Sequence, residues 1–236
     1  MSETSRSLFR NRLLAALPRH EYERVLPKLK MIPLPKGKII YDLGDQAQYA
    51  YFPMNGMLSM LSITEDGSTV EVAMIGNEGM AGLPLILKTE RMPFRVMVQL
   101  PGNAMRLPGN LLREEFNRNG HFQLMLLRYA HTLVTQIAQS AACNRFHSVE
   151  KRLCRWLLIA RDRVKTDTFY LTQEIISQML GVPRTSVTMT AVRIQSMGLI
   201  KYSRGKISIL DRQGLESAAC ECYRIVADEI EHLLVA

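Results

Sequence analysis

Basic side chains give the clearest chemical signal in this sequence. Residues 145–212 hold 13 basic and 5 acidic residues, giving +8; residues 1–144 hold 16 and 12, giving +4, and residues 213–236 hold 1 and 5, giving −4. A positive charge clustered in this way favours a polyanionic partner, because each neutralised phosphate releases a counterion. A well-solvated basic surface without a partner is the alternative.

Residues 171–210 predict the elements that position these side chains. Thr172 is suited to cap a helix, Gly181 to end it in a left-handed conformation, and Pro183 to open a second helix. The core-facing residues would be Ile175, Ile176, Met179 and Leu180 on the first helix, and Val187, Ala191 and Ile194 on the second. This spacing predicts a helix-turn-helix.

Two short strands, Leu199–Tyr202 and Lys206–Leu210, are expected next and would form a wing with Arg204 and Lys206 at its tip. In such an arrangement the start of the second helix enters a major groove, while other groups contact phosphates. The candidate DNA-binding residues are Thr172, Gln173, Arg184, Thr185, Ser186, Thr188, Met189, Arg204 and Lys206. A purely structural helical hairpin is the alternative, which the wing, the turn glycine and the local charge disfavour.

Residues 30–110 are typical of short antiparallel strands. Turn residues recur between apolar stretches at Gly44-Asp45, Asn55-Gly56 and Asp66-Gly67, and again at Pro101-Gly102-Asn103. Asn-Gly and Asp-Gly supply the positive backbone torsions of tight hairpins. The pattern predicts an antiparallel sandwich, barrel or roll that extends to about Pro108.

One long helix is predicted from His121 to Cys143, about 34 Å at 1.5 Å per residue. Its apolar residues form two stripes, which require two partners. We expect the chain's own β-domain on one side and a second copy on the other. The dimer interface is assigned to Phe122, Leu126, Tyr129, Leu133 and Ile137; the second stripe comprises Leu124, Leu127, Val134, Ala138 and Ala141. A helix buried inside a monomer is the alternative.

No pattern supports catalysis or metal binding. The sequence contains no P-loop, GxSxG elbow or dinucleotide fingerprint, and its five histidines form no HExxH pattern. Cys220 and Cys222, expected on one C-terminal helix, would point about 200° apart and so suit chelation poorly. We therefore expect neither an enzyme nor a cofactor, and no metal.

Together these features resemble the Crp/Fnr superfamily of bacterial transcription regulators. The resemblance rests on the turns of the β-region, the long helix and the winged helix-turn-helix, and it covers residues 20–212. It implies a β-roll of the cyclic-nucleotide-binding type that senses an effector, a homodimer on a palindromic double-stranded DNA operator, and contact with RNA polymerase. The effector would reorient the DNA-binding domains about a hinge at residues 144–147.

The resemblance completes the predicted organisation, which is of the α+β class. The parts are a sensory β-roll with an N-terminal helical segment (1–118), a central dimerisation helix (119–144), a winged helix-turn-helix (145–212) and a C-terminal acidic helix (213–236). Apolar runs are too short to cross a bilayer, and the run at residues 13–17 is too short for a secretory signal. We expect a cytoplasmic protein without a membrane partner.

The resemblance also assigns a role to the start of the second helix. Cyclic-AMP-responsive members begin this helix with Arg-Glu-Thr-Val and have a second Arg further along, whereas this chain has Arg184-Thr185-Ser186-Val187 and then Met189. Arg184 is expected to pair with guanine, and the operator is expected to differ. No cysteine precedes Cys143, which excludes the N-terminal iron–sulfur cluster of the oxygen-sensing members.

The sensory site departs further from the family. Its cyclic-nucleotide binders carry Gly-Glu and later Arg-Ser or Arg-Thr, where this chain has Gly79-Met80 and Arg91-Met92. The effector pocket is assigned to Gly79, Met80, Gly82, Leu83, Arg91 and Met92. We expect an effector other than cyclic AMP, or none. The alternative function is a dimeric effector-binding scaffold that does not bind DNA, which the basic residues of the wing disfavour.

Overall fold

The computed structural model describes residues 10–89 and 91–234 of the 236-residue chain. Residues 1–9, at the start of the predicted N-terminal segment, are outside the described residues, as are residues 90 and 235–236. None of the described helices is long and apolar enough to cross a membrane.

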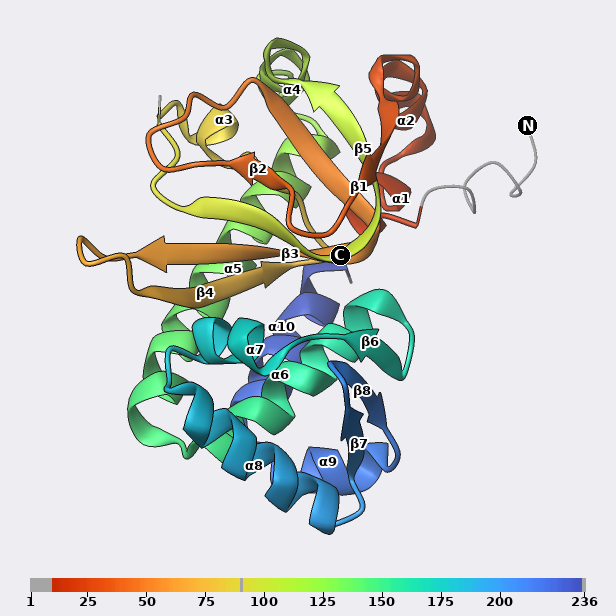
Figure 1. Cartoon of the computed structure of the whole chain (residues 1–236). Coiled ribbons are helices and arrows are strands. Elements are labelled where there is room, and N and C mark those ends of the chain that lie inside the picture. The colour runs from red at the N-terminus through yellow and green to blue at the C-terminus, as the bar shows by residue number, and fades with distance from the viewer. Residues whose placement is uncertain (1–9, 90, 235–236) are drawn as a thin grey trace.

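The N-terminal half is an antiparallel β-domain with strand order β1–β5–β3–β4 and with β2 beside β5 (Figure 1). Its strands are β1 (Lys30–Leu34), β2 (Ile39–Tyr41), β3 (Tyr49–Ile63), β4 (Thr69–Ile75) and β5 (Arg95–Pro108). Its helices are α1 (Arg12–Ala15), α2 (Arg19–Val25), the 3-10 helix η2 (Leu26–Lys28), α3 (Pro84–Leu87) and α4 (Gly109–Phe116). The predicted β-domain and α+β class are confirmed.

Two of the predicted turns are wrong. Gly56 and Gly102 lie inside the long strands β3 and β5, where the pairing register shifts, and do not end hairpins. Gly56 has a φ of +79°, and a Cβ there would lie 2.7 Å from the carbonyl oxygen of Leu100. The positive torsion expected for a hairpin therefore serves a β-bulge, which bends the paired strands without reversing them. The Asp66-Gly67 turn does join β3 to β4.

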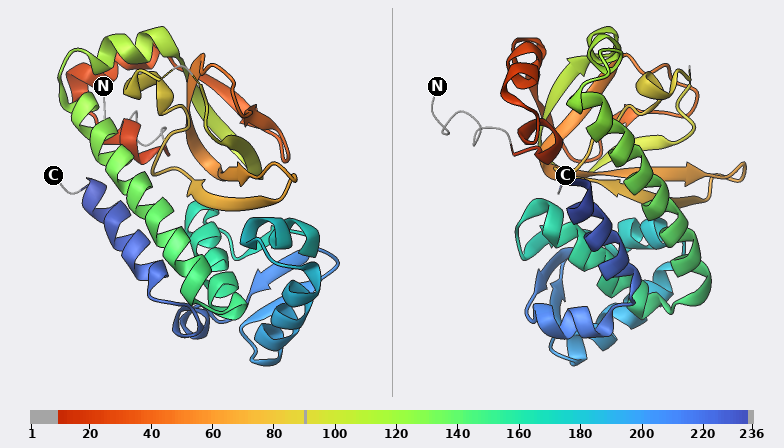
Figure 2. Two further views of the ribbon diagram at one scale, coloured as in Figure 1. Left: turned by 90° about the vertical axis from the view of Figure 1, so that its left-hand side faces the viewer. Right: turned by 180° about the vertical axis from the view of Figure 1, so that it is seen from behind.

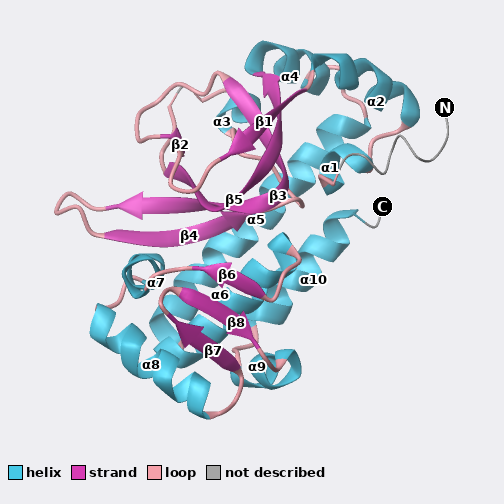
Figure 3. Cartoon of the chain, turned by 45° about the vertical axis from the view of Figure 1, so that its right-hand side comes forward, coloured by secondary structure: helices cyan, strands magenta, loops and turns pink. Residues whose placement is uncertain are grey.

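The C-terminal half contains the long helix and the region predicted to form a winged helix-turn-helix (Figure 3). Helix α5 (His121–Phe146) continues three residues past its predicted end. The elements that follow are α6 (Val149–Val164), β6 (Thr168–Tyr170), α7 (Gln173–Leu180), α8 (Arg184–Ser196), β7 (Ile200–Ser203) and β8 (Lys206–Ile209). The small sheet has the order β6–β8–β7, so β6 is a strand that the sequence analysis missed.

The C-terminal segment is two helices and not the single helix that was predicted. Helix α9 (Arg212–Ala218) ends before Cys220, and α10 (Cys222–Leu234) runs back along α5 (Figure 2). The break places Cys220 in the interior, 4% exposed, where it contacts Cys143. At the other end of α10, Glu231 pairs with Arg12 at 2.9 Å. The segment therefore reaches the β-domain and does not lie only beside the DNA-binding region.

A buried polar network joins helix α6 to strands β3 and β4 and to the loop that follows β4. Arg163 of α6 forms an ion pair with Glu78 at 2.8 Å, and both side chains are at least nine-tenths buried. Trp156 Nε1 donates a hydrogen bond to Glu71 Oε1 at 2.7 Å, and the hydroxyl of Ser59 donates to the same carboxylate. Because an unpaired polar group in the interior is costly, this network determines where α6 sits on the sheet.

The buried carboxyl of Glu71 predicts a pH dependence of stability. Burial raises the pKa of Glu71 from 4.5 to about 7, so between these values the native protein retains a proton that the unfolded chain releases. The free energy of unfolding should therefore fall as pH rises through this window, by about 3 kcal/mol from this group. The free energy of unfolding of Glu71→Gln, measured with urea at several pH values, should not show this fall. Glu65→Gln, in the exposed β3–β4 turn, is the control; an unchanged slope in Glu71→Gln would contradict the assignment.

Candidate nucleic-acid interface and effector cavity

The helix-turn-helix is built by the capping residues that the sequence indicates. Thr172 Oγ1 accepts a hydrogen bond from the backbone N–H of Ile175 at 3.3 Å and begins α7. Gly181 ends α7 with a φ of +60°, and its N–H bonds to carbonyl groups of the last turn. Pro183 directly precedes α8. The predicted helix-turn-helix is confirmed.

Helix α8 has the predicted inner and outer faces. Val187, Ala191 and Ile194 are buried in the domain, whereas Met189 is 74% exposed. Arg184, Thr185 and Thr188 are also exposed, and Ser186 is half-buried. Thr188 Oγ1 donates a hydrogen bond to Gln173 Oε1 at 2.8 Å and so links the start of α7 to α8.

The wing is held against the start of α7. Arg204 and Gly205, with φ of 50° and 76°, form the turn between β7 and β8. Tyr202 Oη donates to the carbonyl oxygen of Leu171 at 2.9 Å, and the N–H of Leu171 donates to the carbonyl oxygen of Gly205 at 2.7 Å. The predicted two-stranded wing is therefore present, with Lys206 exposed at the start of β8.

Three elements meet to form a polar groove of about 360 Å³. Its lining residues are Thr172, Gln173, Arg184, Tyr202, Ser203, Arg204 and Gly205. The fold thus brings together four of the nine predicted DNA-binding residues. Tyr202 and Ser203 were missed, although both belong to the predicted wing.

The cations around this groove are free to bind a ligand. No ion pair among residues 10–89 and 91–234 involves Arg184, Arg204 or Lys206. Arg193, further along α8, is instead paired with Glu150 at 2.8 Å. An exposed groove with unpaired cations on its rim suits an anionic backbone better than a neutral partner.

The stripe of α5 that was assigned to a dimer interface is buried within this chain, and the second apolar stripe is the exposed one. The residues so assigned pack against the chain's own β-domain, and four of them are no more than 3% exposed: Phe122, Leu126, Tyr129 and Leu133. Ile137 is partly buried and lines a cavity that is partly open to solvent. Four of these five side chains are already covered by this chain, so the assignment is corrected for them.

The second apolar stripe faces solvent. Val134 is 64% exposed, and Leu124, Leu127, Ala138 and Ala141 are exposed as well. Helix α10 covers the neighbouring flank of α5, where Glu229 contacts His131 at 3.0 Å. The exposed stripe therefore lies between α10 and the β-domain.

The β-domain and α5 line a partly open cavity of about 240 Å³, where the effector pocket was predicted. Met80, Gly82, Leu83 and Met92 line it as expected, and α5 contributes Ala130, Leu133, Val134 and Ile137. Its lining surface is almost entirely apolar, and no described residue in its wall carries a charge.

Two residues assigned to the effector pocket lie elsewhere. A Cβ at Gly79 would lie 2.2 Å from the ring of Tyr129, so this glycine makes room for α5. Arg91 is exposed and does not line the cavity. The guanidinium that was considered as a phosphate ligand is therefore absent from the cavity wall.

A sensory-type β-domain, a connecting helix and a winged helix-turn-helix define a two-domain DNA-binding regulator. Comparison with family models supports this description: residues 31–119 match the cyclic nucleotide-binding domain, and residues 151–218 match the Crp-like helix-turn-helix domain. The chain belongs to the Crp/Fnr family of transcription regulators, which are not enzymes.

Individual relatives are distant in sequence. The chain is 21% identical over 213 residues to the global nitrogen regulator of Synechocystis sp., covering 86% of this chain and 94% of that protein. A second global nitrogen regulator, from Nostoc sp., is 20% identical over 185 residues, covering 74% and 82%. The structure of FixK2 from Bradyrhizobium japonicum superimposes with a TM-score of 0.68 at 14% identity, covering 81% of this chain and 98% of that one.

Proposed function

We propose that this regulator binds a palindromic DNA operator as a homodimer and that its effector is not cyclic AMP. The observation that carries the proposal is the groove in which the start of α7, the start of α8 and the wing converge around Arg184 and Arg204. Its cations have no acidic partner among the described residues, and a DNA backbone would supply the missing negative charge.

The groove suggests which residues contact bases and which contact phosphates. Arg184, at the exposed N-terminal end of α8, enters a major groove and pairs with guanine. Thr172 and Gln173 at the start of α7, with Arg204 and Lys206 on the wing, contact phosphates. Thr185, Ser186, Thr188 and Met189 complete the surface presented to the bases. Contact with RNA polymerase remains an expectation from the family.

A second copy of the chain is the partner proposed for the exposed stripe of α5. Leu124, Leu127, Val134, Ala138 and Ala141 form an apolar strip along a helix whose other sides are covered by the β-domain and α10. Two such strips related by a two-fold axis would bury each other. The pairing would place two α8 helices in successive major grooves, about 34 Å apart.

The cavity supports an apolar effector or none. A cyclic nucleotide needs a guanidinium and donors for its phosphate, and an apolar wall would leave that charge unpaired. Val134 contributes to both the cavity and the exposed stripe of α5. A ligand in the cavity would therefore touch the helix that forms the proposed dimer interface.

Selection of bound fragments from a random DNA pool, followed by titration of variants, tests DNA recognition. Arg184→Ala should weaken binding to the selected site by roughly 1–3 kcal/mol and relax preference at one base pair. Lys206→Ala should weaken binding to all DNA sequences equally, and it should reduce the slope of log binding constant against log salt concentration by about 1. Lys30→Ala, on the exposed surface of β1, is the matched control. Failure to retain any DNA at low salt would instead favour the scaffold without DNA binding.

Light scattering at micromolar concentration tests the dimer. The parent chain should have the mass of two copies, and Val134→Asp should have the mass of one, because the interface would bury an unpaired carboxylate. Met31→Asp makes the same kind of change on an exposed apolar residue of β1, 62% exposed, and should remain dimeric. A monomeric parent chain would refute the proposed interface.

Calorimetric titration tests the cavity. Cyclic AMP should give no binding at micromolar concentration, because no described charged residue lines the cavity. Small apolar compounds that bind should raise the midpoint of thermal unfolding, and Ala130→Trp, which fills the cavity, should abolish that rise. Micromolar binding of cyclic AMP would overturn this part of the proposal.

A further inference from the structure

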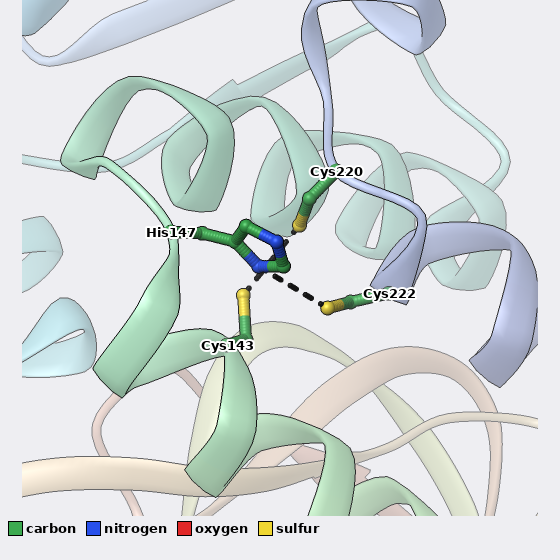
Figure 4. Close-up of side chains that lie close together, drawn as sticks. All are labelled: Cys143, His147, Cys220 and Cys222. Carbon is green, nitrogen blue, oxygen red and sulfur yellow. Dashed lines mark hydrogen bonds between the residues drawn. The ribbon is translucent and has the colours of Figure 1, made fainter.

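Three cysteines and a histidine converge where α5 ends, away from the groove and the cavity (Figure 4). Cys143 lies in the last turn of α5 and His147 directly follows that helix, while Cys220 and Cys222 come from the α9–α10 connection. One donor atom from each residue lies within 4.8 Å of all the others. The proposed function uses none of these side chains.

The helix is interrupted between α9 and α10, whereas the sequence argument against chelation assumed that Cys220 and Cys222 lie on one continuous helix. Cys220 precedes α10 and Cys222 begins it, so the two thiols are not placed by one helical repeat. Both point toward His147 and Cys143 in the close-up of Figure 4. Cys143 and His147, four residues apart, supply the other two donors.

Two of the separations between these donors match the edges of a small tetrahedron, and all of them are no longer than 4.8 Å. Tetrahedral zinc, with bonds of about 2.3 Å to sulfur and 2.0–2.1 Å to nitrogen, would separate two sulfurs by about 3.8 Å and a sulfur from a nitrogen by about 3.6 Å. The Sγ atoms of Cys143 and Cys220 are 3.5 Å apart, and Cys222 Sγ is 3.4 Å from His147 Nδ1. A cluster with several iron atoms would need a wider separation of its ligands, so a single ion fits best.

The surroundings supply the supporting contacts that a metal site needs. His147 Nε2 lies 3.2 Å from a carboxylate oxygen of Glu221, which would orient the ring so that Nδ1 faces the ion. Gln139 Nε2 donates a hydrogen bond to Cys222 Sγ at 3.0 Å. All three thiols are buried, and the imidazole is largely so.

Two buried arginines provide an independent indication of negative charge at this place. Arg152 and Arg155 of α6 are 7% and 6% exposed, and the Nε atom of each has no hydrogen-bond partner. Both interact electrostatically with Cys143. Arg155 also faces the buried carboxyl of Glu71, whereas Arg152 has, among the described residues, only the cysteines as possible anionic neighbours. Neutral thiols would leave Arg152 poorly compensated, whereas three thiolates around one divalent ion carry a net charge of −1.

We infer that Cys143, His147, Cys220 and Cys222 bind one tetrahedral zinc ion. The site has four protein ligands and no open position, which is typical of structural zinc. The ion would tie the end of α5 to the C-terminal segment at the hinge between the two halves of the chain. This inference stands independently of DNA binding, because metal content is measured without DNA.

Elemental analysis of the purified full chain tests the inference directly. We expect one zinc ion per chain, and cobalt exchanged into the site should give the absorption bands of a tetrahedral, sulfur-rich centre. Removal of zinc by a chelator should lower the midpoint of thermal unfolding, since a metal bound only to the native state stabilises it. A chain that holds no zinc and takes up no cobalt would overturn the inference.

Variants distinguish the loss of a metal ligand from a general disturbance of packing in the interior. Cys220→Ser should lose the metal, whereas Cys154→Ser changes an equally buried cysteine of α6 outside the cluster and should keep it. Because a buried substitution can impair folding, Glu221→Gln at the exposed carboxylate provides a second test and should weaken zinc affinity about 10-fold or more with an unchanged circular dichroism spectrum. Full zinc content in Cys220→Ser, unchanged zinc affinity in folded Glu221→Gln, or a Cys143–Cys220 disulfide in the purified chain would contradict the assignment.

Discussion

The ion pair between Arg163 and Glu78 is the constraint on which the arrangement of this protein depends. Both groups are buried, so neither can lose its partner without leaving an uncompensated charge in the interior. Together with the hydrogen bond from Trp156 to Glu71, the pair places α6 on the face of β3 and β4. The position of α6 then sets that of α7, α8 and the wing, because all pack into one core with it.

Helix α5 connects three sites of the molecule: the cavity, the exposed apolar stripe and the cluster of metal-type donors. One side closes the apolar cavity of the β-domain, another presents an exposed apolar stripe, and its end carries two of the four clustered metal-type donors. A change at one of these places therefore acts on an element that the others share. In the proposed dimer, this continuity would give a physical route by which a ligand in the β-domain alters the spacing of the two helix-turn-helix units.

Several expectations failed at positions where a local pattern has two structural uses. A glycine with positive φ serves either a hairpin or a bulge, and the pairing of Gly56 with the partner strand selects the bulge. Similarly, two apolar stripes on α5 are equivalent by periodicity, and only the position of the β-domain shows that Leu126 and Leu133 are covered while Val134 is exposed.

The sequence by itself determined the helix-turn-helix, its wing and the clustering of positive charge, because caps, turn residues and periodicity act over a few neighbouring residues. It also grouped Met80, Gly82, Leu83 and Met92, which line one cavity in the structure. Only the tertiary structure decided which stripe of α5 is free and that Cys143 and His147 meet Cys220 and Cys222. The cluster depends on contacts between residues more than 70 positions apart, and the covered stripe depends on contacts such as that of Tyr129 with Met80, 49 positions apart, which no local pattern encodes.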